Sequence, residues 1–283
     1  MNAKLVLPFG LRDSQGARAR SVEVTPITGQ GELHGAEDPN PFRAVLQLLA
    51  SCTRQLGALR GAQITPAVLG QLLPVDRDYL LLHINRLTFG DERYQTVECP
   101  RSDCHHRLDV RFALSSVDTP VVADRAGGTF ALADGRQVRF RLPVAEDQVE
   151  LHGLAPAALE AAFLQRCVRS ARSDRSDDRA VGWSELREAP ARVRADVVQH
   201  IVAASPELDL AVPLTCLACE RPFQFVFDPV QSLLAELQAS RKQLMSQVHR
   251  LALSYHWSQA EILGLSRALR HEYLDLLQAE AAR

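Results

Sequence analysis

"ECPRSDCHHRLDVRF", residues 98–112, holds two cysteines five positions apart, and "LTCLACERPFQFVF", residues 214–227, holds two more. In both stretches the cysteine pair precedes a run in which apolar and polar residues alternate, which is typical of a β-strand. A structural zinc ion takes four ligands in a tetrahedron, often from two such cysteine pairs. We therefore expect Cys99, Cys104, Cys216 and Cys219 to bind one Zn²⁺ as the two halves of a split zinc ribbon.

Two alternatives remain open for these cysteines. The pairs are unrelated buried thiols, or His105 or His106 replaces Cys104 as a ligand, since the C-x4-C spacing is looser than C-x2-C. Four thiolates would leave no coordination position for water or substrate, so the expected metal is structural. The other two cysteines, Cys52 and Cys167, lie on apolar faces of expected helices and are interpreted as core thiols.

The composition narrows the classes of function. The chain has 283 residues and a formal net charge of −2, with 46% hydrophobic residues. Such a chain can bury a sizeable core, and its charge gives no general attraction to nucleic acid or an anionic membrane. No apolar run approaches the ~20 residues of a membrane span, and the first residues lack a secretory signal pattern. We expect a cytoplasmic protein, in which cysteines serve metals or cores before disulfides.

Hydrophobic periodicity predicts an α+β fold that is mostly helical, with two small β-hairpins besides the ribbon. The predicted parts are an N-terminal β-hairpin (1–30), a helical segment (31–92), the split zinc ribbon (93–116 and 208–228), an inserted hairpin with helices (117–207) and a C-terminal helical segment (229–283).

Local patterns predict the elements within these parts. The first hairpin spans 4–27 and turns at 12–18, and a loop follows it up to a helix at 41–59. Further helices are expected at 65–73, 75–88, 145–153, 156–171 and 183–204. The second hairpin, 129–143, turns at Asp134-Gly135, and residues 170–180 form a charged surface loop. Asp76 and Asp78 are interpreted as the solvated start of a helix.

The C-terminal segment is almost entirely helical. Ser258 and Glu261 form a capping box, and Ser266 can cap the last helix. Three interpretations are open: helices that fold back on their own core, a docking surface for a partner, or a helix-turn-helix for DNA. In the last case the phosphate contacts would come from His249, Arg250, Arg267, Arg270 and His271.

Motifs of catalysis are missing from the sequence. It contains no Walker loop, no paired-glycine dinucleotide turn and no G-x-S-x-G elbow. "HEYLD" at 271–275 begins like a zincin helix, but Asp275 stands where the second histidine is required. We therefore expect a protein that is not an enzyme.

Several segments, in order, resemble the baseplate hub assembly chaperones of T-even-like phages and related contractile injection systems. They are "LPFGLRDSQGARARSVEVTPITG" (7–29), "DRDYLLLHINRLTFGD" (76–91) followed by "ECPRSDC", "VRFRLPVAEDQ" (138–148), "LTCLACERPFQFVFD" (214–228) and "SRKQLMSQVHRLALSYHWSQAEILGLSRALRHEYLDLL" (240–277). The resemblance runs from about residue 5 to residue 278.

The resemblance implies that the same four cysteines are the zinc ligands and that Tyr255, His256 and Trp257 belong to a C-terminal signature. His105 and Glu220 depart from the family pattern, because they occupy positions where glycine would permit a positive φ.

The resemblance implies that the protein is a non-enzymatic assembly factor. It would bind hub, spike or tape-measure proteins of a contractile tail, in the cytoplasm of a bacterium or a phage-infected host. A retained structural baseplate component and a zinc-ribbon nucleic-acid-binding protein are the alternatives.

Overall fold

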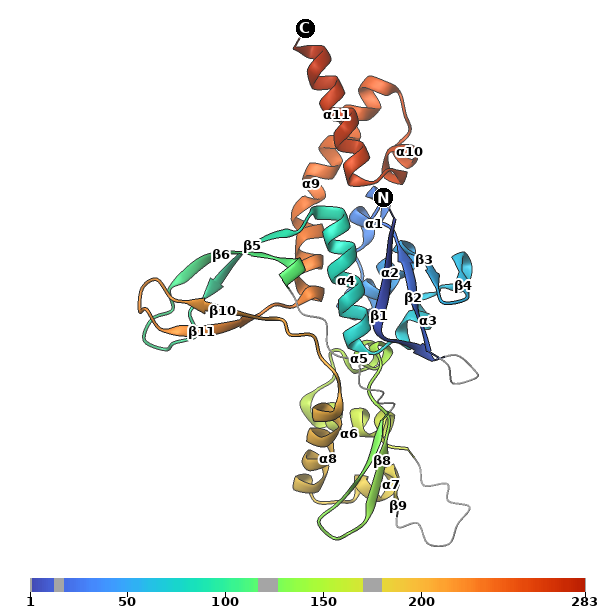
Figure 1. Cartoon of the computed structure of the whole chain (residues 1–283), viewed down its shortest axis with the longest axis vertical. Helices are drawn as coiled ribbons and strands as arrows, with labels where there is room; N and C mark the ends of the chain where they lie inside the picture. The colour runs from blue at the N-terminus through green and yellow to red at the C-terminus, as the bar shows by residue number, and fades with distance from the viewer. Residues whose placement is uncertain (1, 13–17, 117–126, 170–179, 283) are drawn as a thin grey trace.

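The computed structural model describes residues 2–12, 18–116, 127–169 and 180–282. A central body of helices and a small sheet carries three projections: a long arm of β-strands, an inserted unit and a pair of C-terminal helices (Figure 1). Helices alternate along the chain with small, mostly antiparallel strand pairs, so the predicted α+β class is confirmed. Among the described residues, no helix is long and apolar enough to span a bilayer.

The N-terminal hairpin is one half of a four-stranded sheet in the order β1-β2-β3-β4. β1 (Ala3–Arg12) pairs antiparallel with β2 (Arg18–Val24), as predicted, while the predicted turn residues 13–17 lie outside the described residues. β3 (Thr53–Leu56) and β4 (Leu59–Arg60) complete the sheet.

The predicted helix 41–59 is wrong at its end, because α2 (Pro41–Cys52) stops where β3 begins. Thr53 is β-branched and buried, and it pairs with Val24 of β2. Gly57 then adopts a φ of 56°, which permits the reversal into β4. Pairing with a strand about thirty residues earlier therefore ends the helix.

A short helix, α1 (Gly29–His34), replaces part of the predicted loop before α2. It packs on the C-terminal helices, and Thr28 forms an isolated β-bridge with Ser266. A Cβ atom on Gly29 would lie 2.8 Å from Nη1 of the buried Arg270, so a larger residue would displace this guanidinium. The contact that holds α1 therefore comes from the far end of the chain.

The main core lies between the N-terminal sheet and the central helices. It is formed by α2, α3 (Pro66–Gly70), α4 (Pro74–Phe89), α5 (Ala145–Leu151) and the first turns of α9 (Pro229–Tyr255). Short 3-10 turns follow β4 and β6, at Gly61–Gln63 and Leu114–Ser116. Cys52 is buried in this core, as predicted, and burial raises the pKa of its thiol to about 11.

Asp76 is not solvated, contrary to the prediction. Its side chain is fully buried, and its carboxylate accepts hydrogen bonds from the backbone N–H groups of Phe9 (2.8 Å) and Gly10 (2.9 Å). The pairing register of β1 with β2 shifts between Val6 and Leu11, so this part of β1 takes a partner from α4. The aspartate at the start of α4 therefore holds the irregular end of the hairpin.

The inserted unit has a core of its own, which includes Cys167 as predicted. β7 (Gly128–Ala131) and β8 (Gln137–Phe140) form the second predicted hairpin, and Gly135 turns with a φ of 82°. Two further helices and a strand pack on it: α6 (Pro156–Cys167), α8 (Ala191–Ala204) and β9 (Ala180–Val181), which runs parallel to β8. Residues 170–179 of the predicted charged loop lie outside the described residues.

The predicted helix 183–204 is two helices, α7 (Trp183–Arg187) and α8. Pro190 precedes α8 and has an extended ψ of 146°. A proline has no backbone N–H and disfavours a helical conformation in the residue before it, so the helix is interrupted there.

The C-terminal helices fold back along α9, as the first of the three interpretations predicts. α10 (Gln259–Gly264) and α11 (Arg267–Ala281) pack on the second half of α9 and on α1. The capping box is confirmed: Ser258 N donates to Glu261 Oε2 (2.8 Å), and Glu261 N donates to Ser258 Oγ (3.3 Å). Ser266 caps α11 through the backbone N–H of Leu269.

Candidate metal centre

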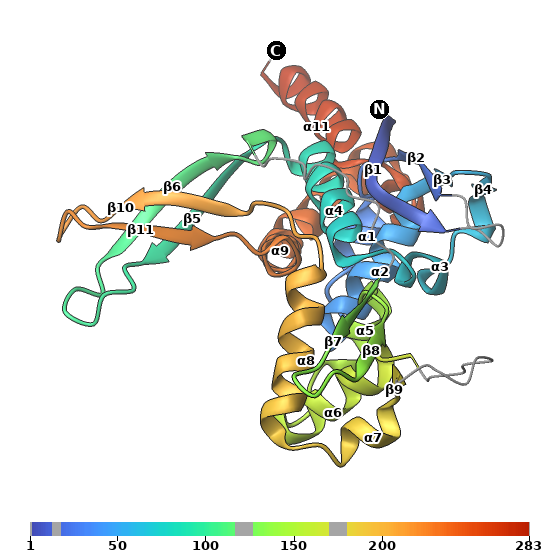
Figure 2. The same ribbon diagram turned by 60° about the horizontal axis from the view of Figure 1, so that its bottom comes forward.

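Two hairpins lie side by side in the projecting arm (Figures 1 and 2). The first joins β5 (Glu92–Glu98) to β6 (Arg107–Ala113), and the second joins β10 (Ala211–Thr215) to β11 (Pro222–Val226). Each cysteine pair occupies the loop that connects its two strands. The tips of both hairpins therefore bring two thiols each to the same end of the arm.

Backbone hydrogen bonds shape both loops into tight knuckles. Cys99 N donates to His106 O (2.9 Å), and Cys216 N donates to Arg221 O (3.1 Å). His105 and Glu220 have φ values of 49° and 57°, in the left-handed region. The resembled family often has glycine at these two positions, and His105 and Glu220 adopt the positive φ that glycine would permit there. A residue with a Cβ atom adopts this conformation at a cost of about 1–2 kcal/mol.

The four sulfur atoms lie within 4.8 Å of one another. Cys99 Sγ is 3.9 Å from Cys219 Sγ, and Cys104 Sγ is 3.7 Å from Cys216 Sγ. With Zn–S bonds of about 2.3 Å, the edges of a regular tetrahedron are about 3.8 Å long. A disulfide would require about 2.05 Å. The sulfur separations therefore fit four ligands around one ion and not two disulfides, and the donor set suits a soft or borderline metal such as Zn²⁺.

The surroundings of the thiols favour their ionised form at one position. A hydrogen bond from the backbone of Arg221 lowers the pKa of the Cys219 thiol to about 6. The Arg221 guanidinium also forms an ion pair with Asp103 of the other knuckle. Arg101 reaches across in the opposite direction, donating from Nη2 to the carbonyl of Pro222 (3.3 Å). Nothing in the sequence of either knuckle indicates which exposed charges meet, so the Asp103–Arg221 pair is visible only in the structure.

The two histidines beside Cys104 are exposed and do not belong to the sulfur cluster. His105 Nδ1 lies 2.7 Å from Glu98 Oε1, and the His105 side chain is 62% exposed. His106 is also exposed. Among the described residues, the group with ligand geometry consists of cysteines alone. Cys104 itself, not a neighbouring imidazole, therefore faces the other three thiols.

Aromatic side chains join the two hairpins at the end of the arm near the body. The Phe112 ring packs edge-on against Phe227, with 5.1 Å between centroids, and against Phe225 at 6.5 Å. The chain leaves β6 for the inserted unit at Ala113 and returns into β10 at Ala211. A metal at the tip would therefore close the arm from the other end, clamping segments that are separated by the whole inserted unit.

Of the five residues expected to touch DNA phosphates in a helix-turn-helix, His249 and Arg250 are exposed on α9, whereas Arg267, Arg270 and His271 are engaged within the chain. Arg270 is completely buried, and both Arg267 and Arg270 form ion pairs with Glu32. His271 Nε2 lies 2.8 Å from Gln247 Nε2 on α9. The basic side chains of α11 therefore serve contacts within the chain, and no basic recognition surface is formed from them.

Comparison with known families adds one match. The family model described as T4 bacteriophage base plate protein matches residues 32–235, from α1 into α9, and this range includes all four clustered cysteines. Neither curated proteins nor solved structures matched the chain.

Proposed function

The chain belongs to the T4 bacteriophage base plate protein family, and from this premise we propose that it is a non-enzymatic assembly factor for the baseplate hub of a contractile tail. In this role it binds hub, spike or tape-measure subunits in the cytoplasm of a bacterial cell or phage-infected host. The bound metal is a structural Zn²⁺ held by Cys99, Cys104, Cys216 and Cys219.

The observation that carries the proposal is the closed set of four thiols at the tip of the arm. Four thiolates fill a tetrahedral zinc site and leave no position at which a substrate or a water nucleophile could bind. Structural zinc in small fingers supplies an apparent ~10–16 kcal/mol of binding free energy, which becomes folding free energy. Such a site supports a rigid scaffold whose task is to present surfaces.

The arm also supports a role in protein recognition. Its large exposed apolar residues are Tyr94 on β5, Leu217 in the second knuckle and Val226 on β11, with exposed fractions of 75%, 81% and 67%. The arm consists of two two-stranded sheets, each with outer edges that no strand within the described residues covers. Apolar side chains beside open strand edges are features that partner proteins use for docking.

The test is to express the chain with the hub, spike and tape-measure proteins encoded beside it, and to purify it through an affinity tag. We expect one of these subunits to co-purify, and deletion of the gene to leave no complete baseplates. Normal particles from the deletion strain would refute the proposal. Mass spectrometry of finished particles then separates the two structural roles, since an assembly factor is absent from them and a retained component is present in fixed stoichiometry.

A further inference from the structure

The two hairpins of the metal arm differ in the hydrogen-bonding groups at their outer edges. In the second hairpin, the bond from Cys216 N to Arg221 O (3.1 Å) fixes which residues of β10 and β11 bond to each other. Every second residue of an antiparallel pair turns its backbone groups to the outer edge, and Pro213 and Pro222 occupy such positions. Proline has no backbone N–H, so a further strand cannot bond continuously to either edge of this hairpin.

The first hairpin, formed by β5 and β6, has no proline in its strands. The bond from Cys99 N to His106 O (2.9 Å) sets the alternation in the same way. The backbone groups of Tyr94, Thr96 and Glu98 on β5 therefore point away from β6. Within the described part of the chain, no strand pairs with this edge. The edge of β5 can thus accept a further strand, whereas the edges of the second hairpin cannot.

A groove of about 550 Å³ lies beside β5, between this strand and α9. Residues 92–95 of β5 line it, as do Ala235 and Ala239 of α9. Among the described residues that line the groove, none belongs to β6, β10 or β11. The groove therefore adjoins the open edge of β5, and the short alanine side chains on α9 leave room for another backbone there.

Arg93 contributes an unpaired hydrogen-bond donor to this groove. The residue is 8% exposed, and its Nη1 donates to the outward-turned carbonyl of Glu92 (2.6 Å), so the guanidinium lies at the open edge. This bond also limits the free part of the edge to Tyr94 and the residues after it. Arg93 Nε is buried and has no hydrogen-bond partner within the described residues. A buried donor without an acceptor is costly, and a backbone carbonyl of a bound segment can supply the acceptor.

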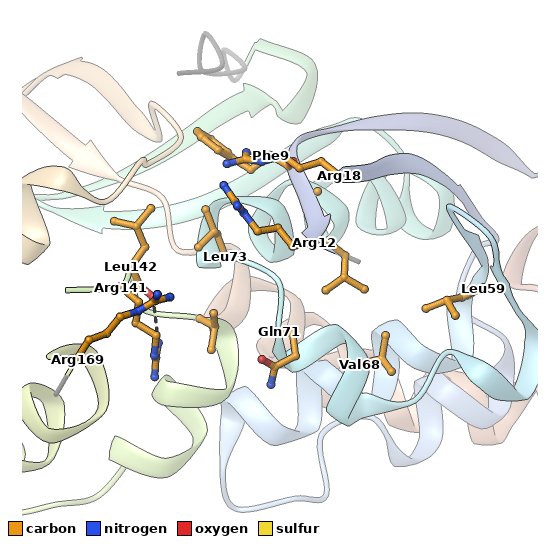
Figure 3. Close-up of a pocket in the computed structure, with 13 residues that line it drawn as sticks. Phe9, Arg12, Arg18, Leu59, Val68, Gln71, Leu73, Arg141, Leu142 and Arg169 are labelled. Atoms are coloured by element: carbon orange, nitrogen blue, oxygen red, sulfur yellow. Dashed lines mark hydrogen bonds between the residues drawn. The ribbon is translucent and has the colours of Figure 1, made fainter. Parts of the chain in front are cut away.

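The groove is separate from the pocket of about 420 Å³ between the N-terminal sheet and the inserted unit (Figure 3). Arg12 and Arg169 line that pocket and adjoin stretches outside the described residues. The described lining of the groove falls within 89–95 and 232–239 and at Arg267, away from those stretches in sequence. The groove thus combines an open strand edge, an unpaired donor and small side chains.

The side chains along the open edge determine which partner fits. The exposed row of alternate residues on β5 begins with Glu92, ends with Glu98 and contains no basic side chain. Glu92 pairs with Arg111, whereas Glu98 is 59% exposed and contacts the imidazole of His105. A second copy of this chain that paired symmetrically through the same edge would place carboxylates at positions 92 and 98 opposite each other, which is destabilising. The edge therefore fits a strand of different sequence, with a basic side chain opposite Glu98.

We propose that β5 and α9 bind an extended segment of a partner protein, which adds a strand to the free edge of β5. Its backbone pairs with Tyr94, Thr96 and Glu98, and one of its carbonyl groups accepts a hydrogen bond from Arg93 Nε. Its small or β-branched side chains fill the groove against α9, and a basic side chain lies opposite Glu98. That the partner is another tail subunit rests on the proposed function, whereas the open edge does not.

The first part of the test changes one backbone N–H on each edge of the same hairpin. Thr96→Pro removes an outward N–H from β5, and Asp109→Pro removes the outward N–H of the directly opposite residue on β6. Both residues are exposed, and both variants lose the same hydrogen bond between the two side chains (2.8 Å). Neither change removes a bond between β5 and β6, so both variants are expected to fold. Zinc content and circular dichroism check that they do.

The second part measures binding by fluorescence polarisation, with three labelled peptides that have blocked ends. Lys-Ser-Thr-Ala-Val-Ala-Gln is the complementary strand, Glu-Ser-Thr-Ala-Val-Ala-Gln reverses its charge, and Glu-Arg-Tyr-Gln-Thr-Val-Glu copies residues 92–98. We expect saturable binding of the first peptide to the wild-type chain, weakened about tenfold or more in Thr96→Pro and unchanged in Asp109→Pro. The other two peptides should bind to the wild-type chain about tenfold more weakly than the first.

Several results would overturn the inference. They are absence of saturable binding, equal affinity of Thr96→Pro and wild type, and an equal loss in both proline variants. Equal or tighter binding of the charge-reversed peptide would do the same, and so would tighter binding of the copy of residues 92–98, which would assign the edge to a second copy of this chain. The peptides test the wild-type chain itself, so the edge stays testable even if a proline variant fails to fold.

Co-purification separates this inference from the proposed function. A tail subunit that co-purifies equally with wild type and with Thr96→Pro keeps the assembly role and refutes the β5 edge as its docking site. Specific binding of the first peptide without any co-purifying tail subunit keeps the edge and refutes the assembly role.

Discussion

Glu32 and Arg270 form an ion pair although 238 positions separate them, and both side chains are buried, with exposed fractions of 1% and 0%. Arg270 also donates to Gln247 Oε1 (3.1 Å) and to the carbonyl of Leu265 (2.8 Å). Every partner of this guanidinium lies in α1, in α9 or in the turn before α11. The pair therefore fastens the C-terminal helices to the body of the protein.

Breaking this pair is expected to destabilise the fold. Glu32→Gln leaves the Arg270 charge buried without its counter-ion, which typically costs about 3–5 kcal/mol in free energy of unfolding. Urea denaturation of the variant and the wild type measures the difference. Glu37→Gln is the control, since Glu37 pairs with Arg241 at the exposed surface and should change the stability little. Equal stability of Glu32→Gln and wild type would show that the pair is not closed in solution.

The four-cysteine site is expected to bind zinc in a fixed ratio to the chain. We expect about one Zn²⁺ per chain by metal analysis, and loss of cooperative thermal unfolding after removal of the metal with a chelator. Cys216→Ser should abolish the bound zinc, because Cys216 is completely buried among the other thiols. Cys52→Ala removes a core thiol outside the cluster and should retain zinc at the wild-type ratio. A metal-free chain that unfolds as cooperatively as the wild type would contradict the structural role.

Replacement of a knuckle residue that has a positive φ by glycine is expected to stabilise the protein. Glu220 holds a φ of 57°, which glycine adopts without steric cost. Glu220→Gly is expected to raise the free energy of unfolding of the zinc-loaded chain by about 0.5–1 kcal/mol after the entropy of glycine is counted. Glu220→Ala removes the same carboxylate and keeps the strain, so it serves as the matched control. The prediction fails if glycine and alanine have the same effect.

The buried carboxyl group of Asp76 is expected to make the stability of the fold depend on pH. Burial raises the pKa of Asp76 to about 6, against the hydrogen bonds from Phe9 and Gly10 that lower it. Because the folded-state pKa lies above the usual 3.8, the folded chain binds the proton more tightly than the unfolded chain. The contribution of Asp76 to stability is therefore present below pH about 4 and is lost as the pH rises through about 6.

Asp76→Asn removes this titration and isolates it. Relative to the wild type, the variant should gain stability on the order of 2–3 kcal/mol between pH about 4 and about 7, on top of a constant loss from the altered hydrogen bonds. Urea denaturation at several pH values measures the difference. Asp134→Asn is the control: a hydrogen bond from Arg136 N holds the pKa of the exposed Asp134 below its usual value, so no change is expected in this window. A stability difference for Asp76→Asn that does not vary with pH would contradict the shift.

Features that depend on neighbouring residues could be predicted from the sequence. The capping box at Ser258 and the turn at Gly135 each depend on contacts within a few positions. The sequence also shows that the four cysteines form two local pairs, because each pair lies in a loop that its own backbone hydrogen bonds close. Pro190 is also a local signal, and it explains why the predicted helix 183–204 is interrupted before α8.

The sequence by itself thus determined the α+β class, the hairpins, the C-terminal caps and which cysteines were candidates for a metal. Only the tertiary structure decided that four sulfurs from hairpins 112 positions apart lie within 4.8 Å, that Asp76 is buried under β1 and that Arg270 meets Glu32. The reason is physical. Backbone conformation follows from adjacent residues, whereas burial and charge pairing are set by whichever distant segments pack together, and no short stretch encodes that choice.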